Sequence, residues 1–218
     1  MLIEKMVELK SRLIEYATLV EDMIDKSVRG LLEKNSGLLD EVINIQEPKA
    51  NNYDRAIDEF CTELIAVFEP VARDLRTVIM IIKMNKDLER MADHAVNISE
   101  SGQYLLKHPL AKSLDQLKIM AQSSTGMLKD SINAFVNQDV VLARDVCERD
   151  NVVDDLGDDI LKDLTGYMRG ENEGIKRSLH VMRIAHNLER VADLSTNICE
   201  EVIYIVEGKD IKHHKDEV

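Results

Sequence analysis

Apolar residues recur every three or four positions along almost the whole chain. Near the N-terminus they include Leu2, Met6, Leu9, Leu13 and Tyr16, and the spacing continues to Leu32. This spacing places apolar side chains on one face of an α-helix. Interruptions of the pattern divide the chain into six predicted helices, over residues 2–34, 38–69, 71–106, 110–136, 139–168 and 174–207.

Few residues break this pattern, and most of them are turn formers. The predicted boundaries are Asn35-Ser36-Gly37, Pro70, Pro109, Asn137-Gln138-Asp139 and Gly170-Glu171-Asn172. Pro48 falls inside the second predicted helix, where it either kinks the helix or delays its start to about residue 48. Long helices joined by short turns predict an all-α bundle of antiparallel helices.

The chain contains an internal repeat. Residues 88–100 read LERMADHAVNISE and residues 188–200 read LERVADLSTNICE, with eight of thirteen positions identical. Upstream, the match continues at a slightly different shift, which aligns Glu47 with Asp150, Asn51 with Asp154 and Ile57 with Ile160. The repeat predicts two tandem, pseudo-symmetric three-helix bundles, over 1–108 and 109–208. Residues 209–218 lack apolar periodicity and are expected to form a flexible tail.

The repeated segment carries oxygen-bearing side chains on one helical stripe. In the first copy the stripe is Glu89, Asp93, Asn97 and Glu100, and in the second it is Glu189, Asp193, Asn197 and Glu200. Carboxylates four residues apart repel each other, and a bound cation reverses this effect. Oxygen ligands suit hard cations such as Mg, Ca, Mn or Fe.

One helix offers too few oxygens to surround an ion, and the second helix of each half could supply others. The candidates are Glu47 and Asn51 in the first half, and Asp150 and Asp154 in the second. In a chain with 41 acidic residues, such pairs also arise by chance and then face solvent. The recurrence of the pair within the same surroundings favours metal binding.

A basic stripe runs beside the acidic one, formed by Lys83, Lys86 and Arg90 and repeated by Arg183, His186 and Arg190. We expect these residues to form salt bridges with the acidic surface rather than an anion site. His94 and His186 are expected to be surface or bridging residues rather than metal ligands.

Composition limits the possible functions. The net charge of −13 argues against binding to nucleic acid or to an anionic membrane, which need a basic surface. The low aromatic content of 4% and the scarcity of Gly and Pro fit an all-α protein. The odd cysteine count predicts reduced thiols. No apolar run reaches the length of a membrane span, and the N-terminus lacks the apolar core of a signal peptide, so we expect a cytoplasmic protein.

The segment RDLRTVIMIIKMNKDLERMADHAVNISE, residues 73–100, resembles the signature helix of the PhoU family, and LERVADLSTNICEE resembles its counterpart. The resemblance implies two three-helix bundles, a homodimer, and acid-x-x-x-Asp motifs that bind iron or another hard cation. Those motifs fall on Glu89/Asp93, Glu189/Asp193 and Asp150/Asp154, whereas Glu47/Asn51 departs from the pattern.

The resemblance also implies a function. PhoU-like proteins act at the cytoplasmic side of a phosphate transporter, contact its ATPase subunit and a sensor histidine kinase, and repress phosphate uptake and phosphate-starvation signalling, and thereby transcription. The alternatives are an accessory protein of another phosphate carrier and a purely structural helical interaction bundle.

Enzymatic function is not predicted. The sequence shows no nucleophile with a base, no Gly-rich phosphate loop and no nucleotide motif. A di-iron carboxylate oxidase would need Glu-x-x-His pairs, and no Glu lies three residues before any of the six histidines.

Overall fold

The computed structural model describes residues 1–109, 115–168 and 174–208, and within these ranges it contains helices and no strand. The six predicted helices are confirmed, with the second divided into three segments. The elements are α1 (Leu2–Leu32), α2 (Ser36–Glu41), a π-helical segment η1 (Val42–Gln46), α3 (Glu47–Phe68), α4 (Ala72–Lys107), α5 (Asp115–Asn137), α6 (Val140–Met168) and α7 (Gly174–Glu207).

The helix boundaries follow from local chemistry. Asn35 caps α2, because its side-chain oxygen accepts a hydrogen bond from the Gly37 backbone N–H at 3.0 Å. Pro70 lies between α3 and α4, as predicted. The predicted break at Gly170-Glu171-Asn172, the predicted start at residue 110 and the predicted tail 209–218 lie outside the described residues.

Pro48 does not delay the start of the second helix to residue 48, because the backbone is already helical from Ser36 onward. The helix passes through Pro48, and the π-helical segment η1 directly precedes it, with the Glu47 N–H bonded to the Val42 carbonyl. Proline lacks the N–H that would continue the α-helical ladder. The change from π-helical to α-helical hydrogen bonding therefore occurs next to Pro48, where the proline already leaves one α-helical hydrogen bond unmade.

The π segment adds one residue relative to the second half. Upstream of it, a shift of 104 residues aligns buried Leu39 with Ala143 and Val42 with Val146. Downstream, a shift of 103 aligns the buried pairs Ala50/Val153, Ile57/Ile160 and Cys61/Leu164. The two halves therefore use the same buried face of their second helix, offset by the inserted residue.

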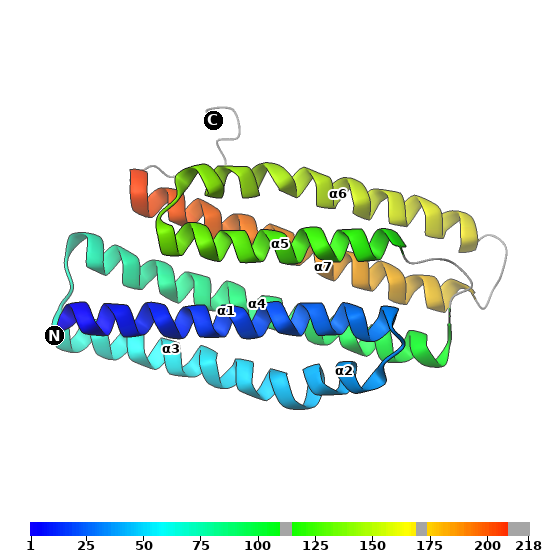
Figure 1. Ribbon diagram of the computed structural model, residues 1–218, viewed down its shortest axis with the longest axis horizontal. Helices are drawn as coiled ribbons and strands as arrows, with labels where there is room; N and C mark the ends of the chain where they lie inside the picture. Colours follow the sequence, from blue (N-terminus) through cyan, green and yellow to red (C-terminus); the bar gives the residue numbers. More distant parts are fainter. Residues whose placement is uncertain (110–114, 169–173, 209–218) are drawn as a thin grey trace.

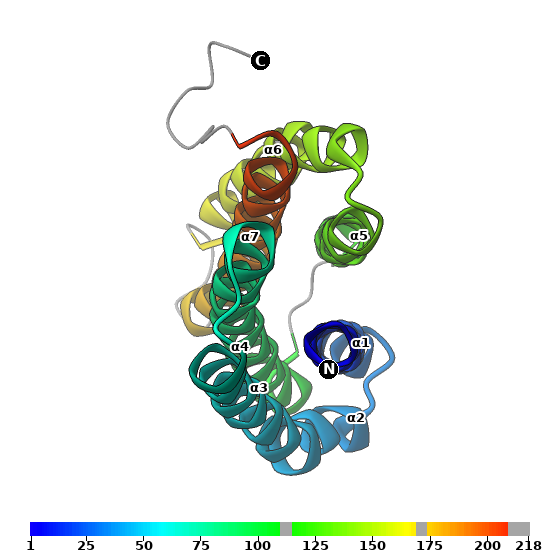
Figure 2. The same ribbon diagram turned by 90° about the vertical axis from the view of Figure 1, so that its left-hand side faces the viewer.

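The helices form an elongated bundle (Figure 1). Seen end-on, α6, α7, α4 and α3 make one curved layer, and α1 and α5 lie together on its concave side (Figure 2). The antiparallel helices α4 and α7 pack against each other at the centre of this layer and join the two halves. The repeated segments therefore lie next to each other in space.

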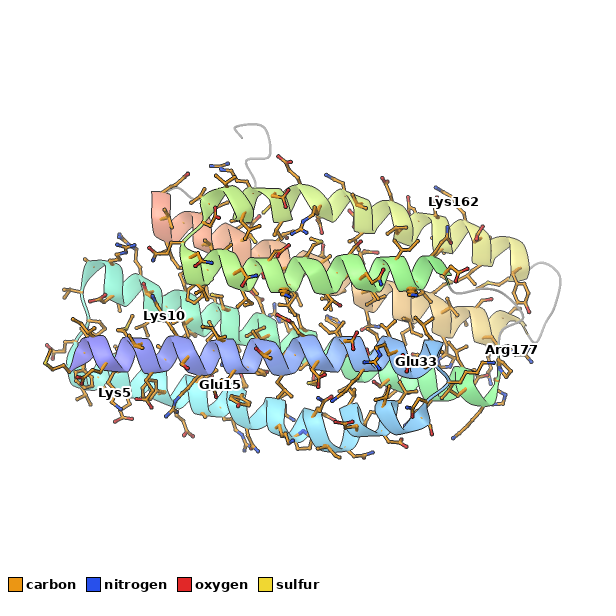
Figure 3. All side chains as sticks on the ribbon, viewed as in Figure 1. Lys5, Lys10, Glu15, Glu33, Lys162 and Arg177 are labelled. Atoms are coloured by element: carbon orange, nitrogen blue, oxygen red, sulfur yellow. The ribbon has the colours of Figure 1, made fainter. Side chains whose placement is uncertain are left out.

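The core is built from the apolar stripes of the helices. Leu88 and Leu188, and likewise Ile98 and Ile198, are completely buried at equivalent positions of α4 and α7. Burial of such side chains is the main favourable term in folding. Charged side chains such as Glu15 and Lys162 point outward (Figure 3).

Two further expectations concern the cysteines and the membrane. Cys61, Cys147 and Cys199 are free thiols, as predicted. Among the described residues, no helix combines the length and apolarity that a bilayer crossing requires.

Candidate metal-binding faces of the two halves

The acidic pairs of the repeat lie on α4 and α7, each beside the second helix of its own half. Glu89 and Glu189 are partly buried, whereas Asp93 is exposed. Their neighbours in sequence, Leu88 and Leu188, are in the core, which fixes the direction in which each pair points.

In the first half, α3 brings a third carboxylate to the pair. Burial raises the pKa of Glu89, and the negative charges of Asp93 and Asp54 raise it further, against the opposing effect of Lys86 and Arg90. The same three carboxylates face the buried hydroxyl of Tyr16 on α1. Burial is the largest cause of the raised pKa of this phenol, and the negative charges of the three carboxylates raise the pKa further.

Two side chains of α4 hold Asp54 in place. The Lys86 ammonium lies 2.9 Å from Asp54 Oδ1 and 3.0 Å from Asp58 Oδ2. The buried amide of Asn85 donates to Asp54 Oδ1 at 2.9 Å and to Asp58 Oδ1 at 3.3 Å. Burial lowers the pKa of Lys86, but the hydrogen bonds to the two aspartates outweigh it, so the net shift is upward and favours the charged ammonium.

In the second half, the third carboxylate comes from Asp154 on α6. Burial raises the pKa of Glu189, His186 opposes this shift, and the charges of Asp154 and Asp193 add to it. Asp154 is one of the two α6 residues, with Asp150, that the sequence offers as ligand partners, and its charge acts on Glu189. A raised carboxyl pKa beside other carboxylates marks a place where a cation would relieve repulsion.

A hollow opens beside Glu189 and has a volume of about 270 Å³. Its walls come from α6 and α7 and are largely apolar; they consist of Gly157, Asp158, Ile160, Leu161, Met182, Ala185, His186 and Glu189. A Cβ atom at Gly157 would lie 3.3 Å from Glu189 Oε2, so the missing side chain leaves room directly next to this carboxylate.

The asparagines and outer glutamates of the stripes have other contacts. Arg183 of α7 hydrogen-bonds Asn97 Oδ1 and lies 3.2 Å from Glu100 Oε2, so these two residues of α4 help to join the halves. Asn197 and Glu200 are partly buried at the equivalent positions of α7.

Glu47 begins α3, and Asn51 lies one turn later with an exposed side chain. Asp150 is partly buried on α6, one turn before Asp154. In the first half it is Asp54, one turn beyond Asn51, whose charge acts on Glu89. Sequence reasoning missed Asp54 because the repeat aligns it with Gly157. Asp54 lies three residues after Asn51, so continuing the helical stripe that starts with Glu47 and Asn51 would have included Asp54.

Within the ranges that the structure describes, no three His, Cys, Asp or Glu side chains gather closely enough to hold a metal ion. The donors nevertheless suit a hard cation, since each half provides carboxylates from two helices and one of them has a raised pKa. A bound ion would draw these carboxylates together, and water would complete its coordination.

The basic stripe forms salt bridges, as predicted. Lys83 lies 3.0 Å from Glu201 Oε1, and Arg190 lies 2.7 Å from Asp193 Oδ2. His94 bridges the halves through a 2.7 Å hydrogen bond between its Nδ1 and Asn187 Oδ1, and His186 is exposed. The expectation that these histidines are surface or bridging residues is confirmed.

Comparison with known proteins identifies the family. The family model of the PhoU domain matches residues 13–102 and again residues 117–202. The chain belongs to the PhoU family. The two matched segments contain the two copies of the repeat, so the internal duplication is a duplication of the PhoU domain.

PhoU relatives span nearly the whole chain. The phosphate-specific transport system accessory protein PhoU homolog of Aquifex aeolicus is 35% identical, over 97% of this chain and 96% of its own length. The PhoU homolog 2 of Thermotoga maritima is 32% identical, over 99% of this chain and 91% of its own length.

Solved PhoU structures have the same fold. The crystal structure of PhoU from Pseudomonas aeruginosa superposes with a TM-score of 0.92, at 30% identity, and covers 96% of this chain and 100% of that one. PhoU from Streptococcus pneumoniae, described as a phosphate transport system regulatory protein, gives a TM-score of 0.89, also at 30% identity, over 96% and 99% of the two chains.

Proposed function

We propose that this chain is a negative regulator of phosphate uptake and of phosphate-starvation signalling. The observation that carries the proposal is the match to PhoU relatives along nearly the whole chain, because these relatives are named accessory proteins of phosphate-specific transport. That name favours the phosphate-specific transporter over another phosphate carrier. The relatives are accessory proteins, so we propose a non-enzymatic role.

The regulator acts through protein contacts at the cytoplasmic side of the membrane. Its partners are the ATPase subunit of the phosphate transporter and a sensor histidine kinase, and it works as a homodimer. The charge of −13 supports protein contacts over direct binding to DNA, which requires a basic surface. Control of transcription is therefore indirect and passes through the kinase.

A hard metal ion is part of this adaptor. Carboxylates from α4 with α3, and from α7 with α6, supply the oxygen ligands, and the ion offsets their mutual repulsion. The raised pKa values of Glu89 and Glu189 support this role, because each carboxylate is held near two others.

Deleting the gene in a host that carries it tests the regulatory role. In phosphate-rich medium, transcripts of the phosphate uptake genes should rise at least severalfold, and a plasmid copy should restore repression. The double variant Asp93→Ala/Asp193→Ala should contain less metal by elemental analysis and should not restore repression.

The matched control replaces two exposed aspartates outside the faces, Asp25→Ala/Asp159→Ala, with the same change in net charge. This control should repress as well as the unchanged protein. Unaltered transcript levels in the deletion strain would refute the regulatory role. Unaltered metal content in the Asp93→Ala/Asp193→Ala variant would refute the assignment of the ligands.

A further inference from the structure

A second hollow, of about 300 Å³, lies between α4 and α7. It is found at the end of the bundle where α4 begins and α7 ends, at the left of Figure 1. Its lining combines two basic, two acidic, two apolar and one aromatic side chain: Arg76, Ile79, Met80 and Lys83 of α4, and Glu200, Glu201 and Tyr204 of α7. The acidic pairs of the repeat do not line it, so this hollow is separate from the metal-binding faces.

The internal repeat provides a counterpart of this place at the other end of the same two helices. The 100-residue shift of the repeat pairs Tyr204 with Tyr104, Met80 with His180 and Gly208 with His108. The tyrosine is therefore the same in both halves, whereas its two neighbours differ.

In the counterpart, two imidazole rings lie against the tyrosine. The rings of Tyr104 and His180 are stacked, with their centroids 3.9 Å apart and an angle of 18° between their planes. The His108 ring lies 4.6 Å from Tyr104, at an angle of 36°. Aromatic rings at such distances attract each other. This position thus accepts a flat ring that contains nitrogen.

Beside Tyr204, the same two positions carry no ring. Met80 is buried and aliphatic, and Gly208 has no side chain, with no atom within 4 Å of the place of a Cβ. In the part of the chain that the structure describes, no second ring lies against Tyr204. The hollow therefore opens at the place that a planar ring occupies in the other half.

The basic side chains lie at opposite ends of the hollow. Lys83 Nζ is paired with Glu201 Oε1 at 3.0 Å, one helical turn before Tyr204. Arg76 precedes Lys83 by seven residues, or about 10 Å of helix, and because α4 and α7 are antiparallel it lies beyond Tyr204 at the other end. Arg76 is exposed, and its guanidinium has no ion pair or hydrogen bond with any described residue. It is available to an anion.

We infer that this hollow binds a small anion that carries a planar nitrogen heterocycle, which is the chemistry of a nucleoside monophosphate. The base stacks on Tyr204 as His180 stacks on Tyr104, and the phosphate pairs with Arg76, whose planar guanidinium suits phosphate oxygens. The volume lies at the lower end of ligand pockets, which favours a ligand of this size. The site uses no metal ion, so it is independent of the metal-binding part of the proposed function.

Calorimetric titration of the full chain with adenosine 5′-monophosphate tests the inference. We expect one site per chain, with a dissociation constant below about 1 mM. Adenosine lacks the phosphate and ribose 5-phosphate lacks the base, so each keeps one of the two contacts and should bind at least tenfold more weakly. Binding of the guanosine, cytidine or uridine monophosphate in its place would support the inference equally, because stacking on an aromatic side chain tolerates every base.

Three variants test the two contacts separately. Tyr204→Leu should weaken binding of adenosine monophosphate at least tenfold, because the stacking surface is lost. Met80→His should have the same effect, because an imidazole would then cover Tyr204 as His180 covers Tyr104. Arg76→Gln should weaken binding of the monophosphate at least tenfold and that of adenosine by less than twofold.

The matched controls are the equivalent substitutions in the other half, Tyr104→Leu and Lys176→Gln, which should leave the affinity within twofold. Helical content by circular dichroism should be unchanged in every variant used. The inference is overturned if none of the four nucleoside monophosphates binds, or if Tyr204→Leu leaves binding within twofold. Equal affinity for ribose 5-phosphate and adenosine monophosphate would also overturn it, because the hollow would then recognise phosphate without a ring.

Discussion

The first and second halves share their buried positions and differ in the charges at their surfaces. Leu88 and Leu188 are equally buried, and Glu89 and Glu189 both have a raised pKa caused first by burial and also by nearby carboxylates. Beside Glu89, however, Lys86 binds two aspartates, whereas a hollow lies beside Glu189. A duplicated fold thus keeps its packing while each copy acquires its own surface chemistry.

The contacts that join the halves show the same kind of difference. Lys83 of α4 pairs with Glu201 of α7, and Arg183 of α7, the counterpart of Lys83, pairs with Glu100 of α4. The side chain of Glu201 is only 5% exposed, whereas that of Glu100 is 51% exposed. Equivalent basic residues of the two halves therefore pair with carboxylates in very different surroundings.

Breaking these two bridges should have unequal effects on stability. Lys83→Met removes a charged partner from a buried carboxylate and should lower the free energy of unfolding by about 1.5–3 kcal/mol. Arg183→Met breaks an exposed pair and should cost about 1 kcal/mol or less. Methionine retains much of the apolar stem in both cases, so packing is comparable. Urea unfolding followed by circular dichroism measures both values, and equal losses would show that burial of Glu201 is not decisive.

Gly157 offers a smaller test of the second half. Gly157→Ala should raise the free energy of unfolding by up to about 1 kcal/mol, because alanine favours the helix. The new Cβ would lie 3.3 Å from Glu189 Oε2, at the flexible end of that side chain, so part of the gain should be lost.

The matched control is Gly166→Ala on the same helix, where a Cβ would meet no atom within 4 Å. Its gain, measured by the same urea unfolding, should exceed that of Gly157→Ala by a few tenths of a kcal/mol. A larger gain in the free energy of unfolding at Gly157 would mean that the Glu189 carboxylate does not lie next to this position.

The helices and the repeat could be predicted from sequence, because apolar spacing sets which face of a helix is buried. The π-helical segment could not, since its one extra residue shows only when the buried positions of α3 and α6 are compared. The cluster of Lys86 with Asp54 and Asp58 also escaped prediction. Its members lie on two helices, and their contact depends on the rotation of α3 against α4.

Anomalous diffraction from crystals soaked in Mn²⁺ tests the metal-binding part of the proposed function most directly, namely that acidic pairs of the duplicated helices hold a hard cation. The account predicts a strong peak within coordination distance of Glu89 and Asp93 or of Glu189 and Asp193. The absence of a peak beside both pairs would contradict it.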